Sequence, residues 1–210
     1  MKTRQTPLLS VRKSPRQARS TQLVSDILEA AVRVLSREGA RRFTTARVAE
    51  EAGVSVGSLY QYFPNKEAIL FRLQVEEWRQ TSDLLGRILG DTDRQPLARL
   101  REAVKAFFRS ERDEAQLRVA LGDAAPLYRN ASETQEQRAK GKRRSAAFMK
   151  EALPNATIAM RTLAADVVMT TMSTVGKTIS ERARSGAEVD AFAEATSDMV
   201  CAYLEKLARG

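Results

Sequence analysis

One short stretch of the 210-residue chain concentrates side chains that could bind a ligand. Residues 52–70 read AGVSVGSLYQYFPNKEAIL and hold two glycines, two serines, two tyrosines, a glutamine and a lysine. Small residues before Gly53 allow one helix to cross closely over the next, and the glycine permits a tight turn. Two short helices joined in this way form a helix-turn-helix, whose second helix lies in the DNA major groove. The stretch therefore predicts contact with double-stranded DNA.

The predicted second helix divides into two faces. Leu59 and Phe63 lie four residues apart and are expected to face inward. The opposite face carries small, polar and aromatic side chains that suit a groove: Ser55, Val56, Gly57, Ser58, Gln61 and Tyr62, with Tyr60 on the flank.

Different chemistry is expected from the members of that face. Val56 and the serines can touch thymine methyl groups or base edges, and Gln61 can pair with adenine. Tyr60, Tyr62 and Lys66 suit phosphates, which fix the register of the protein on the duplex without reading sequence. The alternative for each tyrosine is a half-buried packing role.

Composition argues against catalysis. The chain has no histidine and one cysteine, Cys201, so the usual zinc ligands, histidine-dependent nucleophiles and an intrachain disulfide are excluded. We expect Cys201 to be a buried, inert thiol. The adjacent carboxylates of Glu76 and Glu77 indicate a solvated helix face. No cofactor and no metal are expected.

The charge of the chain is unevenly distributed. The net charge is +9, and residues 1–75 hold 13 Lys and Arg against 6 Asp and Glu. This imbalance predicts that one part meets a polyanion, although a merely soluble basic surface is the alternative. The basic N-terminal residues reach the minor groove or form a solvated tail: Arg12, Lys13, Arg16 and Arg19. The cluster at residues 140–144 indicates an exposed helix face.

Helical signals continue along the whole chain. No segment alternates apolar and polar residues with the period of two that is typical of a β-strand. Ser14 and Pro15 predict the start of a first helix and Gly39 its end. Thr44, Ser55 and Asn65 are predicted caps of three further helices, the last reaching Leu89. Five more helices are expected, at 96–110, 113–121, 132–153, 155–185 and 188–208.

A resemblance to a known family lies in residues 43–70, which read FTTARVAEEAGVSVGSLYQYFPNKEAIL. They resemble the DNA-binding domain of the TetR/AcrR family of bacterial one-component transcriptional regulators, and residues 27–39 resemble that family's first helix. The resemblance covers about residues 20–72. Beyond it the chain is similar to the family only in length and helical character.

The resemblance implies roles for individual residues. Thr44 and Thr45 would open the second helix against the DNA backbone, and Lys66 would contact a phosphate. The implied operator-facing residues are Val56, Gly57, Ser58, Tyr60, Gln61 and Tyr62. Many relatives carry a basic residue or proline in place of Val56, and often histidine in place of Tyr62. Base readout here is therefore expected to depend on apolar contacts and shape.

The family's C-terminal half implies a homodimer and a small-molecule effector. The candidate pocket residues indicate an apolar or aromatic effector: Trp78, Phe107, Phe108, Leu121, Tyr128, Phe148, Met169 and Met172. The candidate dimer contacts come from the last two helices: Val168, Thr171, Val175, Phe192, Met199 and Tyr203. Ordinary core packing is the alternative for both sets.

Together these features predict an all-α fold of about nine helices, divided into a flexible basic tail (1–14), a helix-turn-helix domain (15–66) and an effector and dimerisation domain (67–210). The predicted function is a cytoplasmic repressor, not an enzyme, that binds a pseudo-palindromic DNA operator as a dimer and is released by a small molecule. No apolar run reaches the roughly 20 residues that span a bilayer, so no membrane contact is expected. The alternative is an architectural, nucleoid-associated DNA-binding protein that needs no effector.

Overall fold

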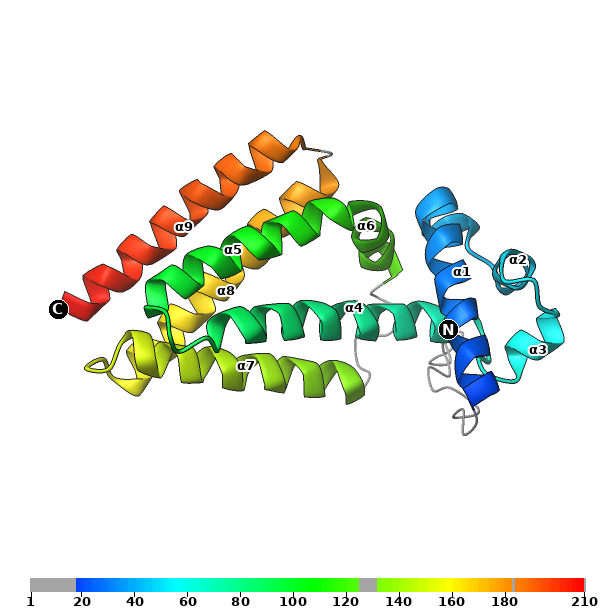
Figure 1. The fold of residues 1–210 in the computed structure, drawn as a ribbon, viewed down its shortest axis with the longest axis horizontal. Coiled ribbons are helices and arrows are strands. Elements are labelled where there is room, and N and C mark those ends of the chain that lie inside the picture. The colour runs from blue at the N-terminus through cyan, green and yellow to red at the C-terminus, as the bar shows by residue number, and fades with distance from the viewer. Residues whose placement is uncertain (1–17, 125–131, 183, 210) are drawn as a thin grey trace, which may run out of the picture. The chain divides into compact units, whose positions relative to one another are not determined.

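The structure, a computed structural model, describes residues 18–124, 132–182 and 184–209. Over these residues the protein is helical, which confirms the predicted all-α class (Figure 1). The predicted tail at 1–14, Arg16 and Tyr128 lie outside the described residues, as does the side chain of Arg19. The nine helices of the described part are α1 (Ala18–Arg42), α2 (Thr45–Glu51), α3 (Val56–Tyr60), α4 (Lys66–Leu89), α5 (Pro96–Asp113), α6 (Ala115–Ala124), α7 (Ser132–Ala152), α8 (Ile158–Glu181) and α9 (Gly186–Arg209).

Polar caps begin three of these helices where the sequence predicts them. Thr44 Oγ1 accepts a hydrogen bond from the Arg47 backbone N–H at 3.3 Å ahead of α2. Ser55 Oγ accepts one from the Ser58 N–H at 3.0 Å ahead of α3. Asn65 Oδ1 accepts one at 2.8 Å from an N–H in the first turn of α4. Each bond satisfies a donor that the helix itself leaves unpaired.

Two glycines provide backbone conformations that other residues adopt at a cost. Gly39 has φ 72° and ψ 170°, so the regular part of α1 ends there as predicted. Gly53, in the turn between α2 and α3, has φ 67°. Both angles lie in the region that glycine occupies without a steric penalty. The second glycine is what makes the predicted tight turn possible.

Two compact units make up the chain, and their limits differ from the predicted boundary at residues 66 and 67. The first unit comprises the described residues up to Glu77 together with those in 116–135, and the second comprises 78–115 and the rest from 136 onward. The first unit includes α6 because Ala120 and Leu121 are 5% and 1% exposed in the same core cluster as α1 and α3. Each unit is therefore formed by two separate segments of the sequence.

A buried ion pair holds α6 against α4 within the first unit. Arg118 Nη1 lies 2.8 Å from Glu77 Oε1, and the two side chains are only 11% and 7% exposed. Gln74 donates a hydrogen bond from Nε2 to the second Glu77 oxygen at 2.9 Å. The prediction that Glu77 belongs to a solvated face is therefore wrong. The basic residue that makes its burial possible lies 41 positions later in the chain.

The second unit is built on α5, α7, α8 and α9, which share one apolar core. Phe108, Met149 and Val189 are among its fully enclosed members. Cys201 is 1% exposed, as expected, and burial raises the pKa of its thiol. The predicted helix at 155–185 is shorter than expected, because the Thr157 hydroxyl accepts a hydrogen bond from Met160 N–H and begins α8 there.

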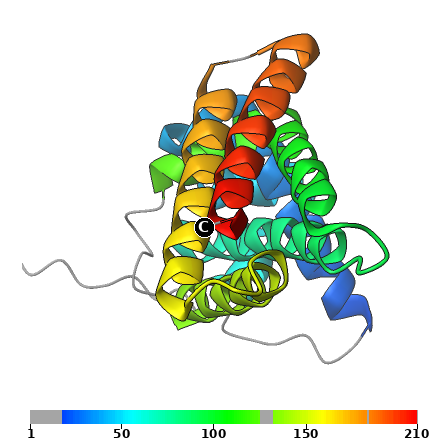
Figure 2. The same cartoon turned by 90° about the vertical axis from the view of Figure 1, so that its left-hand side faces the viewer.

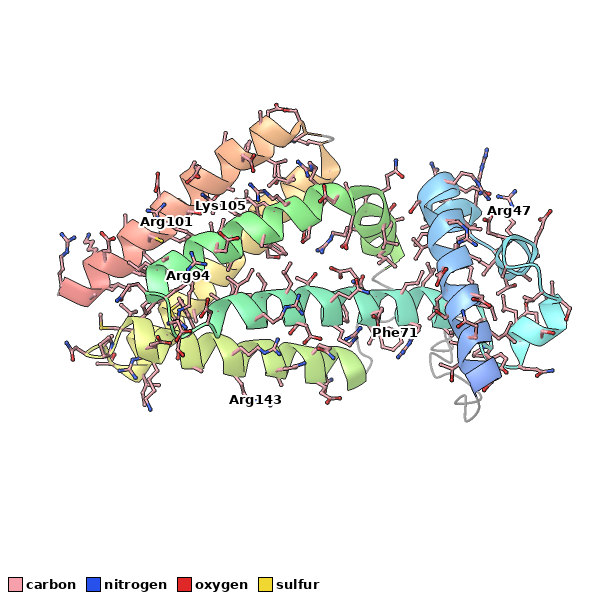
Figure 3. The ribbon with its side chains drawn as sticks, viewed as in Figure 1. Arg47, Phe71, Arg94, Arg101, Lys105 and Arg143 are labelled. Carbon is pink, nitrogen blue, oxygen red and sulfur yellow. The ribbon has the colours of Figure 1, made fainter. Side chains whose placement is uncertain are left out.

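A row of ion pairs joins α5 and α9, which run side by side in opposite directions (Figure 1). Arg101 pairs with Asp198 at 2.5 Å, Lys105 with Glu194 at 2.5 Å and Arg109 with Asp190 at 3.1 Å. Arg101 and Lys105 lie on the side of α5 that faces α9 (Figure 3). All the cations of this row belong to α5 and all the anions to α9.

Arg99 is a fully buried arginine at the start of α5. Its Nη1 donates to the Leu89 carbonyl at 2.6 Å, which caps the end of α4, and its Nη2 pairs with Glu151 of α7. The guanidinium carbon lies 5.8 Å from the centre of the Phe148 ring. One side chain thus joins three helices of the second unit.

We expect Arg99→Met to lower the free energy of unfolding by about 2 kcal/mol, because it strands the Leu89 carbonyl without its donor. Arg101→Met is the matched control on the same helix: its side chain is 40% exposed, and loss of its ion pair should cost less than about 1 kcal/mol. Urea denaturation of both variants measures the difference. Equal losses would contradict the role given to Arg99.

Candidate nucleic-acid interface

The helix-turn-helix is formed by α2, the Gly53 turn and α3, which pack on one another and on α1 (Figure 1). Val48 and Ala49 of α2 are buried, and the Val54 N–H donates to the Ala49 carbonyl at 2.9 Å, which closes the turn. From α3 the Leu59 side chain is 0% exposed, and Phe63, just beyond the helix, is also fully buried. These contacts leave the other side of α3 free for a ligand.

The exposed side of α3 is smaller and less polar than the sequence suggests. Its exposed residues are Ser55, Val56, Gly57, Tyr60 and Gln61. Val56 and Tyr60, four residues apart, are each 39% exposed, which is high for apolar side chains. Ser58 is half-buried, and its Oγ lies 2.8 Å from Ser55 Oγ. No residue of this set is charged.

The position of Tyr62 differs from the prediction that it faces DNA. Its side chain is 6% exposed and belongs to the core cluster of the first unit, so its ring does not face a ligand as expected. The helical turn continues past α3, with Tyr62 and Phe63 both donating backbone hydrogen bonds to the Leu59 carbonyl at 3.0 and 2.9 Å. The turn carries Tyr62 to the inner side. Of the two alternatives for this residue, packing is the one found.

Tyr60 lies beside the first turn of α2. Its hydroxyl is 3.1 Å from Thr45 Oγ1, within hydrogen-bond distance, so the ends of two helices meet at this point. Thr44 is exposed, and Thr45 and Lys66 are half-buried. The side chains predicted to meet the DNA backbone therefore retain partial access to solvent.

An ionic network that was not predicted from the sequence ties α1 to α2. Glu51 accepts from Arg33 at 2.8 Å and from Arg37 at 3.1 Å, and Glu38 pairs with both Arg37 and Arg47. Arg47 extends from α2 toward the end of α1, where it also donates to a backbone carbonyl (Figure 3). The i, i+4 spacing of the two α1 arginines is the one signal that could have indicated a shared partner.

The same network lowers the pKa of Glu51. Hydrogen bonds from Arg33, and then from Arg37, favour the charged carboxylate. A carboxylate whose pKa is depressed on folding stabilises the fold above its unfolded pKa, and this contribution is lost as the pH falls through its folded pKa. At neutral pH the network therefore supports the packing of α1 on α2.

The predicted pocket residues do not form one group. Phe108, Phe148 and Met172 lie in the core of the second unit, beside the half-buried Phe107. Leu121 is wrong as a member of this group, because it is enclosed in the core of the first unit.

Two further pocket residues lie near or at the surface of the second unit. Trp78 is half-buried, and Met169 is 44% exposed. Met169 is not part of the core cluster that contains Phe108, Phe148 and Met172.

The predicted dimer residues separate in a similar way. Val168 is 2% exposed and belongs to the core of its own chain, so it is not a surface contact as expected. Met199 is 55% exposed. The others are half-buried: Thr171, Val175, Phe192 and Tyr203. Phe192 is partly covered by the Arg184 guanidinium, 4.2 Å from its ring centre.

Two family profiles match separate parts of this fold. Residues 27–73 match the profile described as bacterial regulatory proteins, tetR family. Residues 95–207, more than half of the chain, match the profile described as tetracyclin repressor-like, C-terminal domain. The chain belongs to the TetR family. It is thus a TetR-family DNA-binding transcriptional regulator, and since the family is not enzymatic, the prediction that it is not an enzyme is confirmed.

Parts of the chain are similar to proteins from Vibrio and Bacillus. Nucleoid occlusion factor SlmA from Vibrio campbellii is 36% identical over 113 residues, which is 51% of this chain and 55% of that protein. The fatty acid metabolism regulator protein of Bacillus subtilis is 41% identical over 54 residues, 26% of this chain and 28% of that one. The chain therefore spans about half the length of the first of these curated relatives and less of the second.

Solved structures extend the likeness over most of the TetR-family chain. A TetR-family transcriptional regulator from Mesorhizobium loti has a TM-score of 0.70 at 19% identity and covers 89% of this chain and 98% of its own. A transcriptional regulator from Pseudomonas aeruginosa PAO1 has a TM-score of 0.69 at 16% identity, with 91% and 96% covered. At these identities the likeness establishes the fold.

The described ranges of this TetR-family chain hold neither a candidate membrane span nor a candidate metal site. No helix there combines the length and apolar character needed to cross a bilayer. No three His, Cys, Asp or Glu side chains are grouped so that they could hold a metal ion.

The two glycines of the helix-turn-helix should respond oppositely to alanine. A methyl group at Gly57 meets only Ser55 Oγ, at 3.7 Å, so Gly57→Ala should raise the free energy of unfolding by up to about 1 kcal/mol. Gly53→Ala also has room for the methyl group, but φ 67° should make it destabilising by about 1 kcal/mol. Thermal unfolding measures the stability of the two variants.

The same pair of variants tests the exposed face of α3. Gly57→Ala should weaken DNA binding despite its added stability, because the methyl group stands where the backbone would approach the groove. Gel-shift titration measures the affinity. A stabilised variant with undiminished affinity would mean that Gly57 does not approach DNA.

Proposed function

We propose that this protein is a repressor that binds a pseudo-palindromic DNA operator as a homodimer and is released by a small-molecule effector. The observation that carries the proposal is the exposed, uncharged side of α3 on a helix-turn-helix whose inner side is fully packed. Such a helix can enter the major groove with its first residues against base edges. Thr44, Thr45, Tyr60 and Lys66 would contact the backbone, and Ser55, Val56, Gly57, Ser58 and Gln61 would face the bases.

The second unit supports the dimer through a surface that we call the neutral stripe. It consists of exposed, uncharged residues at helical spacing: Leu163, Val167, Thr170 and Thr174 on α8, and Ala191, Ala195, Met199 and Ala202 on α9. In Figure 2 these two helices lie side by side at the front, with no other helix of the second unit over them. Leu163 is 60% exposed and Met199 55%, which favours burial against a second copy.

Two-fold pairing would explain how the short α3 gains specificity. Two recognition helices about 34–36 Å apart would meet two half-sites one turn of DNA apart. An effector that binds more tightly to a form of the dimer with another distance between the recognition helices shifts the dimer population toward that form. Operator affinity falls as a result. The aromatic and apolar side chains proposed for its pocket are Trp78, Phe107, Phe108, Phe148 and Met172. Since Trp78 is the single tryptophan, its fluorescence can report a ligand screen.

A second candidate function is an architectural role on the nucleoid that needs no effector. The observation in its favour is the 36% identity to a nucleoid occlusion factor over about half of this chain. Mapping of occupied sites across a bacterial genome separates the two. A repressor should occupy few sites, whereas an architectural protein should occupy many weak ones.

Selection of bound DNA from a random pool, with the full chain, tests operator binding directly. Enriched sequences should contain two related half-sites. Lys66→Ala should then weaken binding equally across sequences and reduce the slope of log affinity against log salt by about 1. The control, Gln61→Ala, should change sequence preference and leave the slope unaltered. Recovery of no enriched sequence would contradict the proposal.

Val167→Glu or Ala195→Glu should disrupt the dimer, since each places an unpaired charge in the neutral stripe. We expect at least about tenfold weaker self-association in analytical ultracentrifugation, with the helical circular dichroism unchanged. Affinity for a full operator should fall together with self-association. The matched control is Lys150→Glu, an exposed position on α7. A dimer unaffected by both stripe variants would place the interface elsewhere.

A further inference from the structure

The side of α3 that faces outward has few groups left for base readout. Ser55 Oγ already accepts the capping bond from Ser58 N–H at 3.0 Å and lies 2.8 Å from Ser58 Oγ. The Tyr60 hydroxyl is 3.1 Å from Thr45 Oγ1, and Gly57 has no side chain. Each serine hydroxyl is thus partly engaged within the protein, whereas the Val56 methyls and the Gln61 amide take part in none of these contacts.

This composition limits which bases the helix can recognise. Arginine or lysine reads guanine through its two major-groove acceptors, and aspartate or glutamate reads the cytosine amino group. No residue from 55 to 61 is charged, so neither mode is available on this face. An apolar side chain instead recognises thymine, the base that carries a methyl group in the major groove.

Val56 is well placed for that contact. It is the first residue of α3, and at 39% it is among the most exposed apolar side chains of the first unit. The neighbouring Gly57 leaves open space, because a methyl group built on it would meet only Ser55 Oγ. A partner atom can therefore reach the side of the valine as well as its tip.

Resting on the proposed operator binding, we propose that Val56 is a specificity-determining residue that packs against the C5 methyl group of one thymine in each half-site. Gln61 lies five residues further along, a rise of about 7.5 Å along the helix axis. The thymine contact and any base read by Gln61 are therefore separate positions of the half-site.

The test removes the methyl group from DNA. Each thymine of a selected operator is replaced in turn by deoxyuridine, which keeps the hydrogen-bonding groups and lacks only the C5 methyl group. Burial of one such group corresponds to about a fourfold change in affinity. For the full wild-type chain we expect about fourfold weaker binding at one thymine position per half-site and little change at the others.

Protein variants assign the effect to Val56. Val56→Ala should bind the thymine operator more weakly and lose the sensitivity to deoxyuridine, whereas Val56→Thr, which keeps one methyl group, should retain part of it. Gln61→Ala, the matched control, should keep the full fourfold difference. Thermal unfolding checks that the exposed substitutions leave the fold intact.

Three results would overturn the inference. They are a wild-type protein indifferent to deoxyuridine at every thymine, a selected half-site without thymine, and a Val56→Ala variant with unchanged sensitivity. Each of these leaves operator binding standing, because an enriched site has then been found. Selection that enriches no sequence would instead overturn the proposed function, and this inference with it.

Discussion

The structure of this regulator depends on how a helix too short to be stable alone is held in place. α3 spans five residues, and helices below about 12 residues are marginal in water because nucleation costs more than so few hydrogen bonds return. Its stability must come from tertiary packing, and three residues supply it: Leu59, Tyr62 and Phe63, all within the core of the first unit. The Ser55 cap and the Gly53 turn fix where the helix begins. The outward residues Val56, Gly57 and Gln61 take no part in this packing.

A second constraint acts on α4, which contributes residues to both units. In the first unit the buried Arg118 pairs with Glu77, and in the second the buried Arg99 caps the Leu89 carbonyl. Each unit therefore fixes its own part of α4 with an arginine from another helix. Because the guanidinium group stays charged and donates several hydrogen bonds, it satisfies an acceptor that would be costly to bury alone.

Local signals made much of this predictable from sequence. The caps at Thr44, Ser55 and Asn65 and the turn at Gly53 depend on a few adjacent residues, and all lie where predicted. What the sequence could not decide was which side of a helix faces the core. α8 carries apolar or small residues on nearly every side, so Val168 and Met169 looked equivalent, yet one is 2% and the other 44% exposed. Tyr62, Glu77 and Leu121 depend in the same way on partners distant in the chain.

The row of ion pairs between α5 and α9 has a consequence for recombining such regulators. Its cations all lie on α5 and its anions all on α9, so a shift of α9 by one helical turn leaves a charge at each end unmatched. The row therefore favours one position of α9 along its neighbour. A chimera that receives α9 from a relative with another charge order would lose this alignment. The two helices are best regarded as one exchangeable module, although more than 70 residues separate them in the sequence.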